Sequence, residues 1–211
     1  MINTKKRFTV IHPPKTGGNS VHAFMKNNRM YTTEILSTTN QNGANQGIDC
    51  NEFMKHATIK ERAERMKSIG EDPSKYKFLI TVRNPYDAMV SMFHWETNHA
   101  SSFEDTRGNF ERWLFSRGQI YRDWFMNIVD GREGYCYSWI RLEQQDEILS
   151  SLRSEYGLEE DTCFKEAKPI NVSLKRNQRD FRDYYLSDRS VDYVESLWKE
   201  LLGELGYGFY V

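Results

Sequence analysis

The stretch of residues 10–21 most constrains how this chain can fold. An apolar, β-prone run at residues 8–11 is followed by Pro-Pro-Lys-Thr-Gly-Gly-Asn-Ser and then by a helical pattern. This order predicts a strand, a loop that can hold a phosphate, and a helix. Gly17 and Gly18 allow the backbone to approach an anion closely, and the helix turns its unpaired N–H groups toward the same point. The loop is not a Walker A motif, because Lys15 precedes the glycines.

Composition limits the partners that the chain can have. Its 29 Lys and Arg residues balance 30 Asp and Glu residues, and the net charge of −1 gives no electrostatic basis for binding nucleic acid or a membrane surface. Three cysteines without metal-ligand spacing predict a reduced chain in the cytoplasm and no metal site. No stretch is long and apolar enough for a signal-peptide core or a membrane span. The length suits a single domain over residues 1–211.

A second strand-to-helix junction is predicted at residues 77–91. Residues 77–82 form the clearest strand pattern of the sequence, and they are followed by an expected helix cap at Asn84 with Pro85 in the first helical position. Parallel strands of an open α/β sheet bind ligands at their carboxyl edge, where this junction offers Arg83 and Ser91. The alternatives are a salt bridge at the helix end for Arg83 and a hydrogen bond within the helix for Ser91.

Periodicity and capping signals predict the other elements of an α/β fold with a central, mainly parallel sheet. A capping box of Thr58 and Glu61 opens a charged helix that ends near residue 69. Further helices are expected at 19–28, 110–115, 119–129, 144–156 and 188–202, and further strands at 7–12, within 47–57 and at 135–142.

Together the two junctions resemble those of the sulfotransferases that use 3′-phosphoadenosine 5′-phosphosulfate (PAPS), and most of all the carbohydrate sulfotransferase branch. The resemblance is carried by Pro-Lys-Thr-Gly-Gly-Asn-Ser after the first strand and by Val-Arg-Asn-Pro-Tyr-Asp-Ala-Met-Val-Ser after the later one. It implies a P-loop-like, three-layer fold whose central sheet is flanked by helices. It also implies transfer of a sulfuryl group from PAPS to an acceptor hydroxyl, expected on a carbohydrate, with adenosine 3′,5′-bisphosphate (PAP) as the product.

The resemblance also implies roles for particular residues. Arg83 and Ser91 would hold the 3′-phosphate, with the basic residues Lys175, Arg176 and Arg179 as further candidates. The 5′-phosphosulfate would be held by the loop residues Lys15, Thr16, Gly17, Gly18, Asn19 and Ser20.

Lys15 would stabilise the leaving phosphate oxygen, and His56 is the expected general base. His56 directly precedes a helix cap, and its Lys-His-Ala-Thr context resembles the base-bearing segment of the family. Glu143 and Glu52 are the alternative bases, and His12 is expected to be structural, because it ends a buried strand.

Two other functions stay open at this point. A nucleotide kinase or other P-loop NTPase would use a similar fold, although the position of Lys15 and the lack of an obvious Mg²⁺-binding carboxylate beside the loop count against it. A non-catalytic nucleotide-binding module is the second alternative.

The polar residues 30–51 and 97–108 lack core periodicity, and we expect both segments to border the acceptor cleft. The sequence identifies neither the acceptor nor the oligomeric state.

Overall fold

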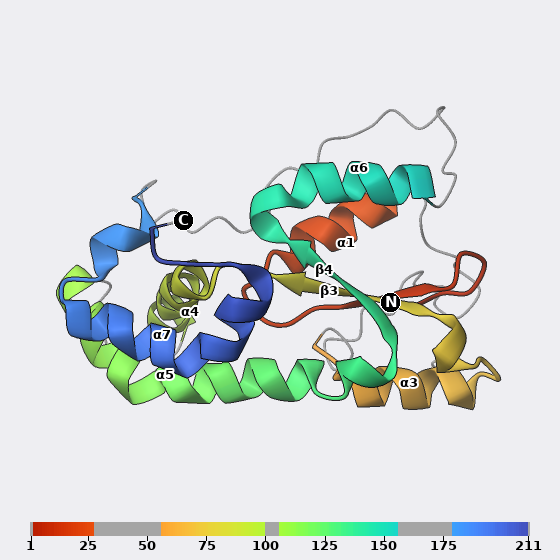
Figure 1. The fold of residues 1–211 in the computed structure, drawn as a ribbon, viewed down its shortest axis with the longest axis horizontal. Helices are drawn as coiled ribbons and strands as arrows, with labels where there is room; N and C mark the ends of the chain where they lie inside the picture. The colour runs from red at the N-terminus through yellow and green to blue at the C-terminus, as the bar shows by residue number, and fades with distance from the viewer. Residues whose placement is uncertain (1, 28–55, 100–105, 156–178, 211) are drawn as a thin grey trace.

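The computed structural model describes residues 2–27, 56–99, 106–155 and 179–210 (Figure 1). These residues contain a four-stranded sheet with the order β1-β2-β3-β4. Strand β1 is antiparallel to β2, whereas β2, β3 and β4 are parallel to one another. The expected α/β fold with a mainly parallel sheet is therefore confirmed. The strands are β1 (Ile2–Asn3), β2 (Phe8–Ile11), β3 (Lys77–Val82) and β4 (Cys136–Arg141).

The helices lie on both sides of this sheet and beyond its carboxyl end. They are α1 (Gly18–Asn27), α3 (Ile59–Ser68), α4 (Pro85–His99), α5 (Arg107–Val129), α6 (Gln145–Glu155) and α7 (Asp188–Leu205). Figure 1 shows α1 and α6 on one side of the strands and α3 and α5 on the other, an arrangement compatible with three layers. Helices α4 and α7 pack against α5 on the side toward which the strands point.

Side chains alternate between the two faces of the sheet. Ile11 of β2 and Ile80 of β3 are directly paired, and both belong to the main buried cluster, which also takes in α3, α4, α5 and α7. The paired residues Val10 and Leu79, with Ile140 of β4, are buried on the opposite face. Because both faces of β2 and β3 are covered, these two strands read as nearly continuous apolar runs in the sequence.

Helix α5 corrects the sequence-based expectation. Separate helices were expected at 110–115 and 119–129, but residues 107–129 form one helix. Gly118 lies buried within it, and a Cβ at this position would lie 3.3 Å from Cε1 of Tyr193 on α7. The glycine therefore marks the place where α7 approaches α5, not a break. Of the polar loop expected at 97–108, residues 97–99 belong to α4 and residues 107–108 to α5, and residues 100–105 lie outside the described residues.

Most other predicted elements are confirmed to within a few residues. The capping box is present, with the Thr58 hydroxyl accepting from the Glu61 N–H and the Glu61 carboxylate accepting from the Thr58 N–H. Strand β1 was not predicted, because two residues are too few to show a periodicity. The segment 30–51, most of the strand within 47–57, and Glu52, Lys175 and Arg176 lie outside the described residues. In the described ranges, no helix is long and apolar enough to cross a membrane.

Candidate functional site

The loop between β2 and α1 has an unusual backbone. Lys15 has φ 64° and Gly17 has φ 78°, so two residues adopt the left-handed conformation within one short turn. This conformation is uncommon for a residue with a Cβ, and at Lys15 it is typical of a functional constraint. Helix α1 begins at Gly18, so its first N–H groups and the positive end of its dipole face the turn. Such a backbone suits an anion.

Neighbouring side chains explain why both glycines are needed. A Cβ on Gly17 would overlap the Leu142 side chain, which follows β4, and a Cβ on Gly18 would overlap the ring of His12. The turn is therefore enclosed between the carboxyl ends of β2 and β4. Neither position accepts a side chain without moving its neighbour. Of the other predicted loop residues, Asn19 is partly exposed in the first turn of α1 and Ser20 is buried.

Thr16 does not present its hydroxyl to the mouth of the loop. Its Oγ1 donates to the carbonyl of Pro13 at 2.7 Å and lies 2.6 Å from Oγ1 of Thr81 on β3. A hydroxyl has one hydrogen, so Thr16 has no second O–H to donate. Its hydroxyl hydrogen is therefore used within the fold. Any contact from Thr16 to a phosphate would come from its backbone N–H.

Arg83 stands at the carboxyl end of β3, next to the loop. Its Nε and Nη2 lie 2.6 and 2.5 Å from Oδ2 of Asp87, one turn into α4, so the structure shows the helix-end salt bridge. Both side chains are largely buried. The salt bridge to Asp87 fixes the orientation of the Arg83 guanidinium. The N–H donors on Nη1 are not used in this salt bridge.

Tyr121 connects α5 with the loop. Its hydroxyl donates to the carbonyl of Pro14 at 2.8 Å. Burial raises the pKa of Tyr121, so its hydroxyl stays protonated and donates this hydrogen bond. This role could not be predicted from the sequence, because the tyrosine lies within an apolar helical pattern.

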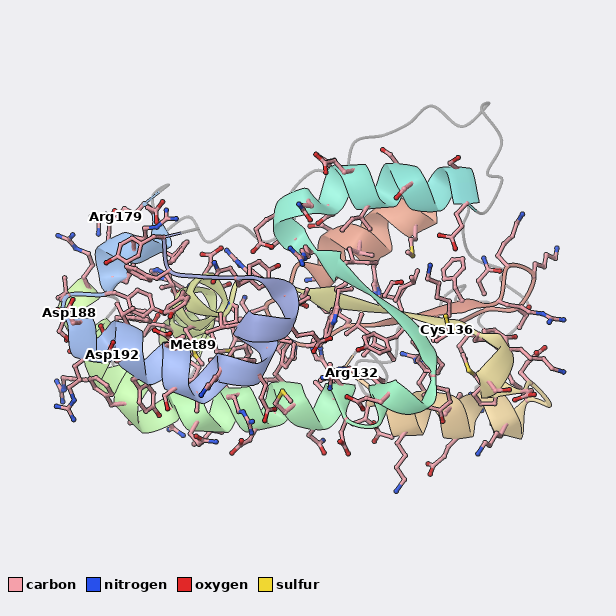
Figure 2. All side chains as sticks on the ribbon, viewed as in Figure 1. Met89, Arg132, Cys136, Arg179, Asp188 and Asp192 are labelled. Carbon is pink, nitrogen blue, oxygen red and sulfur yellow. The ribbon has the colours of Figure 1, made fainter. Side chains whose placement is uncertain are left out.

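Ser91 and Arg179 are not joined to this group. Ser91 is partly buried on α4, about two turns beyond Arg83, and in the described ranges no hydrogen bond links it to Arg83 or the loop. Figure 2 shows Arg179 at the outer end of the molecule, away from the carboxyl ends of the strands. The structure therefore does not bring Arg179 to the loop.

Glu143 supplies the third strand end of the site. Its Oε1 accepts from the N–H of Asn84 at 2.7 Å, and its Oε2 accepts from the hydroxyl of Tyr207 at 2.7 Å. Burial and the neighbouring Glu143 charge raise the pKa of Tyr207, so its hydroxyl stays protonated and donates. Asn84 also caps α4, through its side-chain oxygen to the Tyr86 N–H at 3.1 Å, as predicted. Glu143 thus holds α4 and the C-terminal segment together, which favours a structural role over that of a base.

His56 lies beside the residue that leads into the loop. Its Nδ1 is 2.7 Å from the carbonyl oxygen of His12. A carbonyl only accepts, so Nδ1 carries the hydrogen, and in the neutral form of the ring the lone pair is therefore on Nε2. The His56 ring contacts the ring of His12, with centroids 4.9 Å apart, and that of Trp124, 5.7 Å apart. His12 itself is buried, in keeping with its expected structural role.

Comparison with known proteins adds no assignment. A scan of the sequence against protein-family models gives no match, and a search of curated proteins gives none either. The function is therefore inferred from the site and from the sequence resemblance.

The arrangement suits the binding and transfer of an anionic group. Lys15 and Arg83 bring positive charge to one edge of the sheet, beside backbone N–H groups at the start of α1. His56 places an imidazole next to the same loop, and its Nδ1–H bond to the His12 carbonyl leaves Nε2 as the nitrogen that would accept a proton. In the part of the chain that the structure describes, no three His, Cys, Asp or Glu residues form a metal-binding group.

Proposed function

We propose that the protein transfers a sulfuryl group from PAPS to an acceptor hydroxyl, on a carbohydrate. The position of His56 is the observation that carries this proposal. Its Nδ1–H donates to the carbonyl of His12, where β2 leads into the loop, so a basic Nε2 is held beside the loop. For an acceptor hydroxyl to attack, the loop must hold the anionic donor in place and a neighbouring base must accept the hydroxyl proton.

The proposed donor is a nucleotide with phosphates at both ends, bound along the carboxyl edge of the sheet. In this proposal, Arg83 and Ser91 bind the 3′-phosphate, and Arg83 is already held by Asp87. The loop residues bind the 5′-phosphosulfate, mainly through backbone N–H groups, the Lys15 charge and the Asn19 amide. The left-handed backbone at Lys15 and Gly17 supports this assignment, because it opens the turn for an anion.

Each group has one task in the transfer. The acceptor oxygen forms a bond to sulfur while the bond from sulfur to the 5′-phosphate oxygen breaks. His56 Nε2 accepts the proton of the acceptor hydroxyl. Lys15 stabilises the negative charge that develops on the leaving phosphate oxygen, as cations do in the related transfer of phosphoryl groups.

Replacing His56 by Ala tests the proposal. The variant should lose transfer of label from radiolabelled PAPS to glycan acceptors by roughly 10²–10⁴-fold, the usual contribution of a general base. Its affinity for PAP should be nearly unchanged, because the base contacts the acceptor. Lys15→Ala should instead weaken both PAP binding and transfer. Near-normal turnover in His56→Ala would show that the base lies elsewhere.

His22→Ala serves as the matched control for His56→Ala. The His22 ring also contacts the ring of His12, with centroids 5.3 Å apart. It lies on α1 and has no task in the proposed transfer. This variant should keep most of its turnover, so an equal loss in both variants would indicate a general disturbance of the histidine cluster.

A further inference from the structure

Two large apolar side chains are exposed on α5, and one of them contacts His56. Trp124 is 39% exposed and Ile120 is 58% exposed. They are four residues apart, so they share one face of the helix. The Trp124 ring meets the His56 ring at 72°, in an edge contact. Large apolar side chains gain free energy when they are buried, and a pair left exposed beside a candidate base therefore indicates a binding surface.

The adjoining, buried face of α5 fixes this pair relative to the phosphate-holding loop. Tyr121 and Phe125, which alternate with the exposed residues, are both buried. The Tyr121 hydroxyl donates to the Pro14 carbonyl at 2.8 Å, and the Phe125 ring packs on Trp198 of α7 with centroids 5.1 Å apart. Trp124 is thus carried by a helix that is bonded directly to the loop. A ring that stacks on it would be held at a defined distance from the transferred group.

A polar edge runs beside the apolar pair. Asp123 accepts hydrogen bonds from Gln119 Nε2 at 2.7 Å and from Arg122 Nη1 at 3.1 Å. The Gln119 hydrogen bond is the main cause that lowers the pKa of Asp123, so its carboxylate stays ionised at neutral pH. Asp123 precedes Trp124 and follows Ile120 by three residues, which places it at the edge of their face.

We infer that Trp124 and Ile120 form a stacking subsite for a pyranose ring of the acceptor. A pyranose has an apolar face of C–H groups and a rim of hydroxyls. The indole and the isoleucine match the face, and the carboxylate and amide of Asp123 and Gln119 match the rim. A phenol or another planar aromatic acceptor would use the indole but would leave this polar edge without hydroxyl partners. The inference rests on the proposed function, since it assigns the acceptor of that same site.

Saccharide binding and PAP binding are measured separately, so that the subsite and the proposed function are tested independently. The probes are maltotriose, cellotriose and triacetylchitotriose, with 4-nitrophenol as the aromatic comparison. Binding is followed by saturation-transfer difference NMR on the full chain, with and without PAP. Trp124→Ala should weaken binding of the preferred trisaccharide about tenfold and leave PAP affinity unchanged. The thermal midpoint of the variant, measured in parallel, shows whether its fold is kept.

Trp95→Ala is the matched control. Trp95 is 41% exposed on α4. Its neighbour Glu96 accepts a hydrogen bond from the indole of Trp113, which lies about three turns from Trp124 along α5. Its loss should leave trisaccharide binding unchanged. The inference is overturned if the wild type binds none of the three sugars, or if Trp124→Ala binds them as the wild type does. It is also overturned if Trp95→Ala weakens binding as much as Trp124→Ala does, or if only the binding of 4-nitrophenol depends on Trp124. Failure to bind PAP would contradict the proposed function alone.

Discussion

Arg83 shows how a single side chain of the site depends on its immediate neighbour. The sequence predicted both a phosphate contact and, as the alternative, a salt bridge at the helix end. The structure contains the salt bridge to Asp87, with both side chains largely buried. The two interpretations are compatible, because a guanidinium that is oriented by one anion can still bind a second one through its other N–H groups.

Replacing Asp87 by Asn tests this dual role. The isosteric amide removes the charge that compensates a largely buried Arg83, so the free energy of unfolding should fall by about 1–3 kcal/mol. PAP brings a phosphate that replaces the lost negative charge. In thermal denaturation, PAP should therefore raise the midpoint of Asp87→Asn by more than it raises the wild-type midpoint, and AMP should not show this difference. Equal shifts by PAP in both proteins would argue against a phosphate at Arg83.

Among the elements, α7 is fastened to the edge strand β4 through one carboxylate. Glu204 Oε1 accepts from Trp139 Nε1 at 2.8 Å and from the Tyr137 hydroxyl at 3.1 Å, and its Oε2 lies 3.1 Å from Nη2 of Arg132. Burial opposes ionisation of Glu204, but the Trp139 hydrogen bond and the Arg132 charge outweigh it and lower the pKa below the usual 4.5. The ionised form therefore stabilises the fold.

This stabilisation should depend on pH. Because the pKa of Glu204 is lower in the folded chain, its contribution is fully present above about pH 4.5 and is lost as the pH falls through the folded value. Glu204→Gln should lower the free energy of unfolding by about 1–2 kcal/mol at pH 7, and the deficit should shrink below pH 4. Urea denaturation across this range measures it. Glu200→Gln, an exposed position on the same helix, is the control and should change little. A deficit that is independent of pH would contradict the account.

Local signals predicted most of these elements but not their extent. The capping box at Thr58 and the cap at Asn84 depend on residues that are close in the sequence, and both were predicted correctly. The length of α5 was predicted wrongly, because Gly118 is explained by the approach of Tyr193 on α7. A buried glycine at a helix contact and a glycine that ends a helix look alike in the sequence.

At the scale of the whole molecule, three strand ends meet at one edge of the sheet. The sequence predicted two of the three junctions. It did not predict that Glu143 would bond to Asn84, or that Tyr121 would bond to Pro14, because these contacts join residues far apart in the chain. The hydrogen bond from His56 to His12 is of the same kind. Which residues belong to the site was therefore partly predictable from motifs, whereas their partners follow only from the tertiary packing.

Calorimetric titration of the full chain with PAP and with AMP tests the central claim most directly. If the sheet edge binds a nucleotide through a 3′-phosphate, PAP should bind at least about tenfold more tightly than AMP, since a charge-assisted contact to a guanidinium contributes about 1.5–3 kcal/mol. Arg83→Ala should remove this preference, and ATP with Mg²⁺ should bind more weakly than PAP. Equal affinities of the wild type for PAP and AMP, or a preference for ATP with Mg²⁺, would contradict the assignment.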